Sequence, residues 1–198
     1  MQILRFHDRT PSRWKSGRGV TWEYAVHPAG AGPDDFYWRI NRAHVAHHVA
    51  FSVFPGIERT LTVVAGDAID LLFPDRRVRL DRTTRPYSFS AEVPIECRIP
   101  AGAIDNLNVM TRRGHWTHRV ERTRLDGPTR FVFDGDVALV VALDPLRLTD
   151  GDDRTIDLAG GDAALFEPAL DVAVDVAARG GAGELLCITL DHVARRVS

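Results

Sequence analysis

Apolar and polar residues alternate most clearly over residues 57–64. In an extended strand, every second side chain lies on the same face. Arg59 therefore points the same way as three aliphatic side chains, whereas glutamate and threonine occupy the opposite face. A guanidinium on an apolar face is costly unless it is paired. We therefore expect Arg59 to have a carboxylate partner, which comes either from the protein or from a ligand.

The first half of the chain contains further strand-like segments separated by short turns. The Phe54-Pro55-Gly56 corner precedes residues 57–64, and Gly66-Asp67 follows them and favours a hairpin. Further strands are predicted at residues 2–6, 21–26, 36–45, 68–73, 78–80, 87–89, 94–99 and 107–112. Many short strands at this spacing are typical of an all-β sandwich or barrel.

The second half continues in the same style without a readable repeat. Residues 169–178 are rich in alanine, so a helix competes with a strand there. Strands are predicted at residues 115–122, 129–133, 137–142, 147–148, 155–158, 162–166, 169–177 and 184–191.

Composition narrows the class of protein. The 198 residues contain 44% hydrophobic residues, enough for a real core, and the formal charge of −2 gives no general reason to bind nucleic acid or an anionic membrane. No apolar run approaches the length of a membrane helix, and the N-terminus lacks a signal-peptide apolar region. Cys97 and Cys187 form no disulfide-rich pattern. We expect a cytoplasmic protein that binds neither nucleic acid nor a membrane and is compatible with a homodimer.

Four pieces of the sequence resemble segments of one known family. Two of them are Phe36-Tyr37-Trp38-Arg39 and the run Phe-Ser-x-Phe-Pro-Gly-x-x-Arg at residues 51–59. Residues 14–23 are similar to the pattern Trp-x-Asn-Gly-Gly-x-x-Thr-x-Glu, and residues 108–113 are similar to Asp-x-Asn-x-Met-x-Arg. In this order and spacing, over about the first 113 residues, they resemble the HutD/Ves family of cupin-like proteins.

The sequence departs from the family pattern at a few positions. Ser16 stands where the family usually has asparagine, and Arg18 interrupts the glycine run. Asn106 falls where the family has aspartate, and Asp105 comes one place earlier. A one-residue offset on a strand reverses the face of the side chain. The family role of that aspartate is therefore not transferred to Asp105.

The resemblance implies both a fold and a function. The implied fold is all-β, a double jelly-roll barrel or bicupin, with a pocket-bearing barrel at residues 1–113 and a second, closely packed barrel at residues 114–198. The implied function is non-catalytic binding of a carboxylate intermediate of histidine degradation, urocanate or formylglutamate, which modulates histidine utilisation without a cofactor. The alternative is a cupin enzyme that acts on a small carboxylic acid with Glu23 as acid/base.

Candidate ligand-binding residues gather around Arg59. One interpretation is that Arg59 forks onto a ligand carboxylate; the other is that it forms an internal ion pair with Glu23. Aromatic residues are expected to supply a flat apolar wall, and polar residues on strands to add contacts. The predicted set is Arg59, Lys15, Thr21, Glu23, Trp38, Phe54, Asn108 and Arg112.

Histidines and nucleophiles are weaker candidates. His44 and His48 share a strand face but lack the usual cupin pattern of metal ligands, and His115 and His118 are spaced to lie on different faces. No Gly-x-Ser-x-Gly nucleophile motif occurs. We therefore predict no metal site and no catalytic residue.

Overall fold

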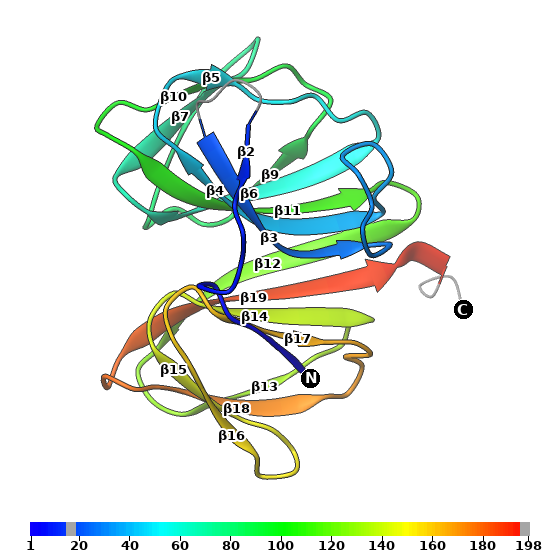
Figure 1. Ribbon diagram of the computed structural model, residues 1–198, viewed down its shortest axis with the longest axis vertical. Helices are drawn as coiled ribbons and strands as arrows, with labels where there is room; N and C mark the ends of the chain where they lie inside the picture. The colour runs from blue at the N-terminus through cyan, green and yellow to red at the C-terminus, as the bar shows by residue number, and fades with distance from the viewer. Residues whose placement is uncertain (15–18, 195–198) are drawn as a thin grey trace. The chain divides into compact units, whose positions relative to one another are not determined.

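The computed structural model describes residues 1–14 and 19–194. Strands and no α-helix are found in these residues, and the strands form four sheets (Figure 1). The chain divides into two compact units, a first unit of Arg9–Thr117 and a second unit of Met1–Asp8 with His118–Ser198. The all-β prediction is confirmed.

The first unit contains a six-stranded and a four-stranded sheet. The strand order of the larger sheet is β2 (Ser12–Arg13), β3 (Gly19–His27), β4 (Trp38–Val45), β11 (Ile104–Arg112), β6 (Ile57–Ala65) and β9 (Tyr87–Ser90). The order of the smaller sheet is β5 (Val49–Ala50), β10 (Glu96–Arg98), β7 (Ala68–Leu72) and β8 (Arg77–Asp81).

Two apolar clusters flank Arg59 along β6. Leu61 belongs to a cluster in which the larger sheet packs against residues of the smaller one, such as Ile69. Ile57 belongs to a second cluster, which includes Phe36. Arg59 lies between these two β6 positions on the same face and is only 7% exposed. The strand pattern thus places one guanidinium at the gap between two apolar clusters.

Glycines make the two turns at the ends of β6 possible. Gly56 has a φ of +74° in the predicted Pro55-Gly56 corner, and Gly66 has a φ of +84° in the predicted hairpin to β7. Side chains rarely adopt such angles. A Cβ on Gly66 would also lie 2.5 Å from the carbonyl oxygen of Ala103, so only glycine fits there without a shift.

The second unit also contains two sheets. The five-stranded sheet has the order β1 (Gln2–Leu4), β17 (Ala163–Phe166), β14 (Val137–Ala142), β19 (Gly183–His192) and β12 (Trp116–Leu125). The four-stranded sheet has the order β13 (Thr129–Val132), β18 (Ala173–Ala178), β15 (Leu146–Thr149) and β16 (Thr155–Leu158). Their buried leucine, valine and phenylalanine side chains form one apolar core.

The helix considered for residues 169–178 does not form. The segment contains β18, in which Val174 and Val176 are buried and Asp175 is exposed. This alternating burial suits a strand with one face on the core. Packing of the two valines therefore outweighs the helix propensity of the neighbouring alanines.

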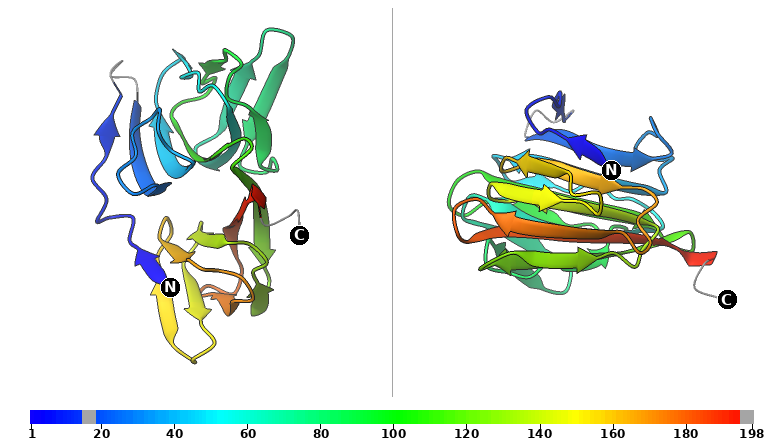
Figure 2. Two further views of the ribbon diagram at one scale, coloured as in Figure 1. Left: turned by 90° about the vertical axis from the view of Figure 1, so that its right-hand side faces the viewer. Right: turned by 90° about the horizontal axis from the view of Figure 1, so that it is seen from below.

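The N-terminal strand pairs with a distant part of the sequence. β1 runs antiparallel to β17, with Gln2 opposite Leu165, and Figure 2 shows this strand at the N-terminus beside the strands of the second unit. The first eight residues therefore group with residues 118–198, whereas the sequence predicted that they belong to the first barrel.

In the part of the chain that the structure describes, no helix is long and apolar enough to cross a membrane.

Candidate functional site

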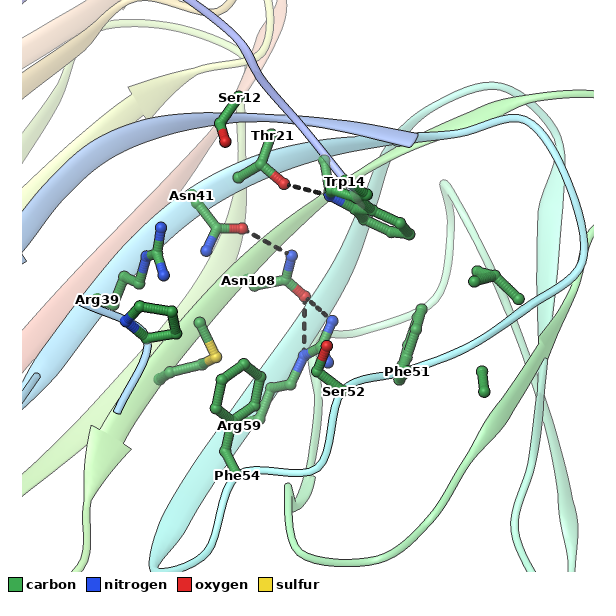
Figure 3. A pocket seen from close by; sticks show the side chains of 15 residues that line it. Ser12, Trp14, Thr21, Arg39, Asn41, Phe51, Ser52, Phe54, Arg59 and Asn108 are labelled. Atoms are coloured by element: carbon green, nitrogen blue, oxygen red, sulfur yellow. Dashed lines mark hydrogen bonds between the residues drawn. The ribbon is translucent and has the colours of Figure 1, made fainter. Parts of the chain in front are cut away.

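A cavity of about 480 Å³ lies within the first unit. Its wall comes from β2, β3, β4, β6 and β11 and from the segment of residues 49–54 (Figure 3). Aromatic rings and apolar side chains share the wall with hydroxyl, amide and guanidinium groups. The described lining residues that bear on the chemistry are Trp14, Thr21, Arg39, Asn41, Phe51, Ser52, Phe54, Arg59, Asn108 and Met110.

Arg59 is the buried cation of this cavity. Its Nε and Nη2 donate hydrogen bonds to Asn108 Oδ1, at 3.0 and 2.6 Å, and its guanidinium lies 4.4 Å from the ring centroid of Phe51. None of the ion pairs among the described residues involves Arg59. Burial lowers the pKa of Arg59 to about 10, and no carboxylate of the described residues offsets this desolvation cost.

A chain of amides continues from Arg59 across the sheet. Asn108 stands opposite Asn41 in the pairing of β11 with β4. Asn108 Nδ2 donates to Asn41 Oδ1 at 3.0 Å and to Asn106 Oδ1 at 2.8 Å. All four hydrogen-bonding positions of the Asn108 side chain are therefore occupied, which holds its amide plane in place.

A second arginine lines the cavity. Arg39 Nε lies 2.8 Å from Glu23 Oε2, and both side chains are partly exposed. Arg39 contributes to the cavity wall, whereas Glu23 does not. The ion pair between Glu23 and Arg59 that the sequence left open is not formed, because Arg39 is the partner of Glu23 and Asn108 is the partner of Arg59.

Three of the other predicted residues line the cavity. Thr21 does so with its Oγ1 accepting a hydrogen bond from Trp14 Nε1 at 2.7 Å, and Phe54 and Asn108 are also in the wall. The predicted Lys15 lies outside the described residues.

Besides Glu23, the predicted residues Trp38 and Arg112 lie away from the cavity wall. Trp38 neighbours Arg39 in β4 and so points to the opposite face, where its ring stacks on that of His27 at a centroid distance of 5.7 Å. Arg112 donates from Nε to the carbonyl oxygen of Phe36 and from Nη2 to that of Asp34, at 3.1 and 2.9 Å. It therefore braces the loop before β4.

Sequence reasoning missed Arg39, Asn41 and Phe51 as lining residues. A signal for the first two was present, because Arg39 and Asn41 alternate with the apolar Trp38 and Ile40 along one strand. Phe51 lies in an irregular segment, where no periodicity indicates the direction of a side chain.

His44 and His48 have protein partners. His44 Nδ1 is 2.7 Å from Asp105 Oδ1, and His48 Nδ1 accepts a hydrogen bond from the amide of Ile99 at 3.1 Å. Residues 1–14 and 19–194 contain no group of three or more histidine, cysteine, aspartate or glutamate side chains that could hold a metal ion.

The fold is similar to that of cupin proteins. A cupin 2 conserved barrel domain protein from Leptotrichia buccalis is similar in structure, with a TM-score of 0.60 over 96% of both chains at 11% identity. This likeness concerns the fold alone.

The chain belongs to the HutD family, whose model matches residues 6–183. An uncharacterised 21.2 kDa protein in the hutC 3' region of Pseudomonas putida is 30% identical over 142 residues, which are 72% of this chain and 73% of the relative. A conserved protein of unknown function from Pseudomonas aeruginosa PAO1 has a TM-score of 0.88 at 25% identity, covering 96% of this chain and 98% of the other. HutD from Pseudomonas fluorescens SBW25, in a formate condition, has a TM-score of 0.81 at 23% identity with the same coverage.

Proposed function

We propose that this protein is a non-catalytic bicupin that binds a small carboxylate intermediate of histidine degradation, urocanate or formylglutamate, and thereby modulates histidine utilisation. The observation that carries the proposal is Arg59. Its guanidinium is buried beside a cavity of about 480 Å³ and has only a neutral amide as its hydrogen-bond partner in the described residues. A ligand carboxylate would supply the missing negative charge and suits the fork of the guanidinium.

The rest of the cavity wall supports binding of a planar or partly apolar acid. Phe51 lies beneath the guanidinium, and Phe54 and Trp14 add further aromatic surface to the wall. Such rings bind flat ligands well, and a few polar groups among apolar ones are typical of small-molecule sites. The planar imidazole and acrylate of urocanate suit these rings, whereas the second carboxylate of formylglutamate suits Arg39.

The charged groups of the wall favour binding over catalysis. The charged residues in the described lining are Arg39 and Arg59, and neither is a suitable general acid or base near neutral pH. Glu23, the acid/base of the enzyme alternative, is held by Arg39 and is not part of the wall. The geometry therefore supports a receptor for an anion better than an enzyme.

The link to histidine utilisation rests on the family. The chain belongs to the HutD family, and its Pseudomonas putida relative is described by its place beside hutC. The bicupin architecture is supported by the two units, each with a pair of sheets. The free thiols of Cys97 and Cys187 suit a reducing compartment such as the cytoplasm.

A thermal-shift screen tests the proposal. A ligand that binds only the folded state raises the melting temperature in proportion to the logarithm of its concentration above Kd. We expect urocanate or formylglutamate to stabilise the protein, and imidazole or formamide at the same concentration to have no effect. A screen in which no carboxylate of this pathway shifts the melting temperature would rule out the proposed ligand class.

A further inference from the structure

The orientation of the Asn108 amide follows from its neighbours. Arginine has only hydrogen-bond donors, so the atom of Asn108 that faces Arg59 must be the oxygen. Both Nε and Nη2 of Arg59 donate to that oxygen. Asn108 Nδ2 therefore faces away from Arg59, and its two hydrogens go to the side-chain oxygens of Asn41 and Asn106.

This arrangement also fixes the amide of Asn41. Its Oδ1 accepts from Asn108, so Nδ2 is the atom that remains available to the cavity, whose wall includes Asn41. Figure 3 shows this nitrogen turned away from Asn108. Within the described part of the chain, neither Asn41 Nδ2 nor Arg59 Nη1 has a hydrogen-bond partner. The side chains of Asn41 and Arg59 are both hydrogen-bonded to the Asn108 amide, so their two unpaired donor groups lie on either side of Asn108.

We propose that Asn41 is a ligand-binding residue that donates a hydrogen bond to the ligand anion held by Arg59, and that Asn108 is the residue positioning both donors. The inference rests on the proposed carboxylate site and adds the residue that sets its selectivity. A carboxylate has two oxygens and satisfies two adjacent donors. A primary carboxamide of the same shape has one oxygen, and its amino group leaves one donor facing another donor.

Asn41 and Asn106 provide a matched pair for the test. Each accepts one hydrogen from Asn108 Nδ2, at 3.0 and 2.8 Å, and each is buried, but only Asn41 lines the cavity. Asn41→Asp and Asn106→Asp add the same charge, and each substituted residue is linked to Arg59 through hydrogen bonds of Asn108. Both retain an oxygen for Asn108. Only Asn41→Asp replaces the cavity-facing N–H group with a negatively charged acceptor.

The experiment is calorimetric titration with urocanate and with urocanamide, and with N-formylglutamate and with its diamide, on wild type and both variants. We expect Asn41→Asp to lose about 100-fold in carboxylate affinity and Asn106→Asp to lose less than about 10-fold, because only the first opposes the ligand directly. The ratio of carboxylate to amide affinity should fall in Asn41→Asp alone. Asn41→Ser, which removes the donor without adding charge, should lower the same ratio by about 10-fold and serves if Asn41→Asp fails to fold.

The outcomes separate the two proposals. Equal losses of carboxylate affinity in Asn41→Asp and Asn106→Asp would mean that the added negative charge near Arg59 accounts for both losses. This result would overturn the role of Asn41. An unchanged ratio of carboxylate to amide affinity in a folded Asn41→Ser protein would also overturn the role of Asn41, but it would not contradict the carboxylate site at Arg59. A wild-type protein that binds none of the four probes overturns the proposed function and this inference with it.

Discussion

Arg59 in the first unit and Asp162 in the second are both buried charges, but their partners differ. In the second unit, Asp162 is 2% exposed and its carboxylate accepts hydrogen bonds from the amides of Phe6 and Ala159, at 2.9 and 3.0 Å. Arg5 Nη1 adds an ion pair at 2.8 Å. In the first unit, Arg59 is 7% exposed and has the side-chain oxygen of a neutral amide as its hydrogen-bond acceptor.

The two residues differ in whether the described chain supplies a partner of opposite charge. Burial alone raises the pKa of Asp162, but its hydrogen bonds and Arg5 outweigh burial, and the pKa is lowered overall. Burial lowers the pKa of Arg59, and no carboxylate among residues 1–14 and 19–194 opposes it. A charge whose partners lie in the chain stabilises the fold, here by joining the N-terminal segment to the later part of the second unit. A charge without such a partner is costly in the free protein, and the proposed ligand carboxylate would offset that cost.

The largest predicted effect on stability comes from Asp162→Asn. The amide would turn an NH₂ group toward donors, and Arg5 would lose its anion, so we expect a loss of about 2–4 kcal/mol in the free energy of unfolding. Urea denaturation at pH 7 measures it. A loss below about 0.5 kcal/mol, the range of ordinary surface substitutions, would show that Asp162 is not an anchor.

Arg59→Met is the matched change in the first unit. Methionine removes a desolvated charge but leaves Asn108 Oδ1 without its donors, and these terms oppose each other. We therefore expect the unfolding free energy of the ligand-free protein to stay within about 1 kcal/mol of wild type. A loss as large as that of Asp162→Asn would mean that Arg59 is a structural anchor too.

Acid should weaken the anchor of the second unit. The pKa of Asp162 is lower in the folded than in the unfolded chain, so its contribution is complete above the unfolded pKa of about 4 and is lost as the pH falls through the folded value. Wild type should lose more stability between pH 7 and pH 3 than Asp162→Asn does. Parallel slopes for the two proteins would contradict this assignment.

Ligand binding at alkaline pH should change the protonation of Arg59. With a pKa of about 10 in the free protein, Arg59 is partly deprotonated at pH 10, and a bound carboxylate would raise that pKa again. Ligand binding should therefore take up more protons at pH 10 than at pH 7. Calorimetry in buffers of different ionisation enthalpy measures this uptake, and Arg59→Met should lack it.

The smallest effect is expected for Glu23→Gln. The ion pair of Glu23 with Arg39 is partly exposed and contributes about 1 kcal/mol or less. Its loss frees the charge of Arg39, so carboxylate affinity should rise by about two- to fivefold with little change in melting temperature. A reaction of the bound acid that wild type performs and Glu23→Gln does not would favour the enzyme alternative instead.

Much of the fold follows from local patterns in the sequence. The predicted strand at residues 57–64 is β6 (Ile57–Ala65), and the Gly66-Asp67 hairpin leads into β7 (Ala68–Leu72) as expected. These elements were predictable because alternation and turn glycines act over a few residues. The pairing of β1 with β17 was not, since it joins residues more than 150 positions apart without a local signal.

Part of the candidate site could also be predicted, because alternation along a strand is a local pattern. Alternation placed Arg59 on an apolar face, and the structure brings Thr21, Phe54 and Asn108 to the same cavity. Trp38 was expected there, but the position next to it, Arg39, has the cavity-facing side chain. Glu23 pairs with Arg39 rather than Arg59 because β3 lies beside β4, whereas β4 and β11 separate β3 from β6, and this strand order has no clear mark in a single sequence.

The most direct test of the account is calorimetric titration of urocanate and formylglutamate into wild type, Arg59→Ala and Arg59→Lys. A charge-assisted, forked contact predicts a loss of about 2–5 kcal/mol in binding free energy for Arg59→Ala, with Arg59→Lys recovering only part because an ammonium cannot fork onto both oxygens. Melting curves of the same proteins show whether each is folded. Unchanged affinity in a well-folded Arg59→Ala protein would contradict the claim that Arg59 holds the ligand.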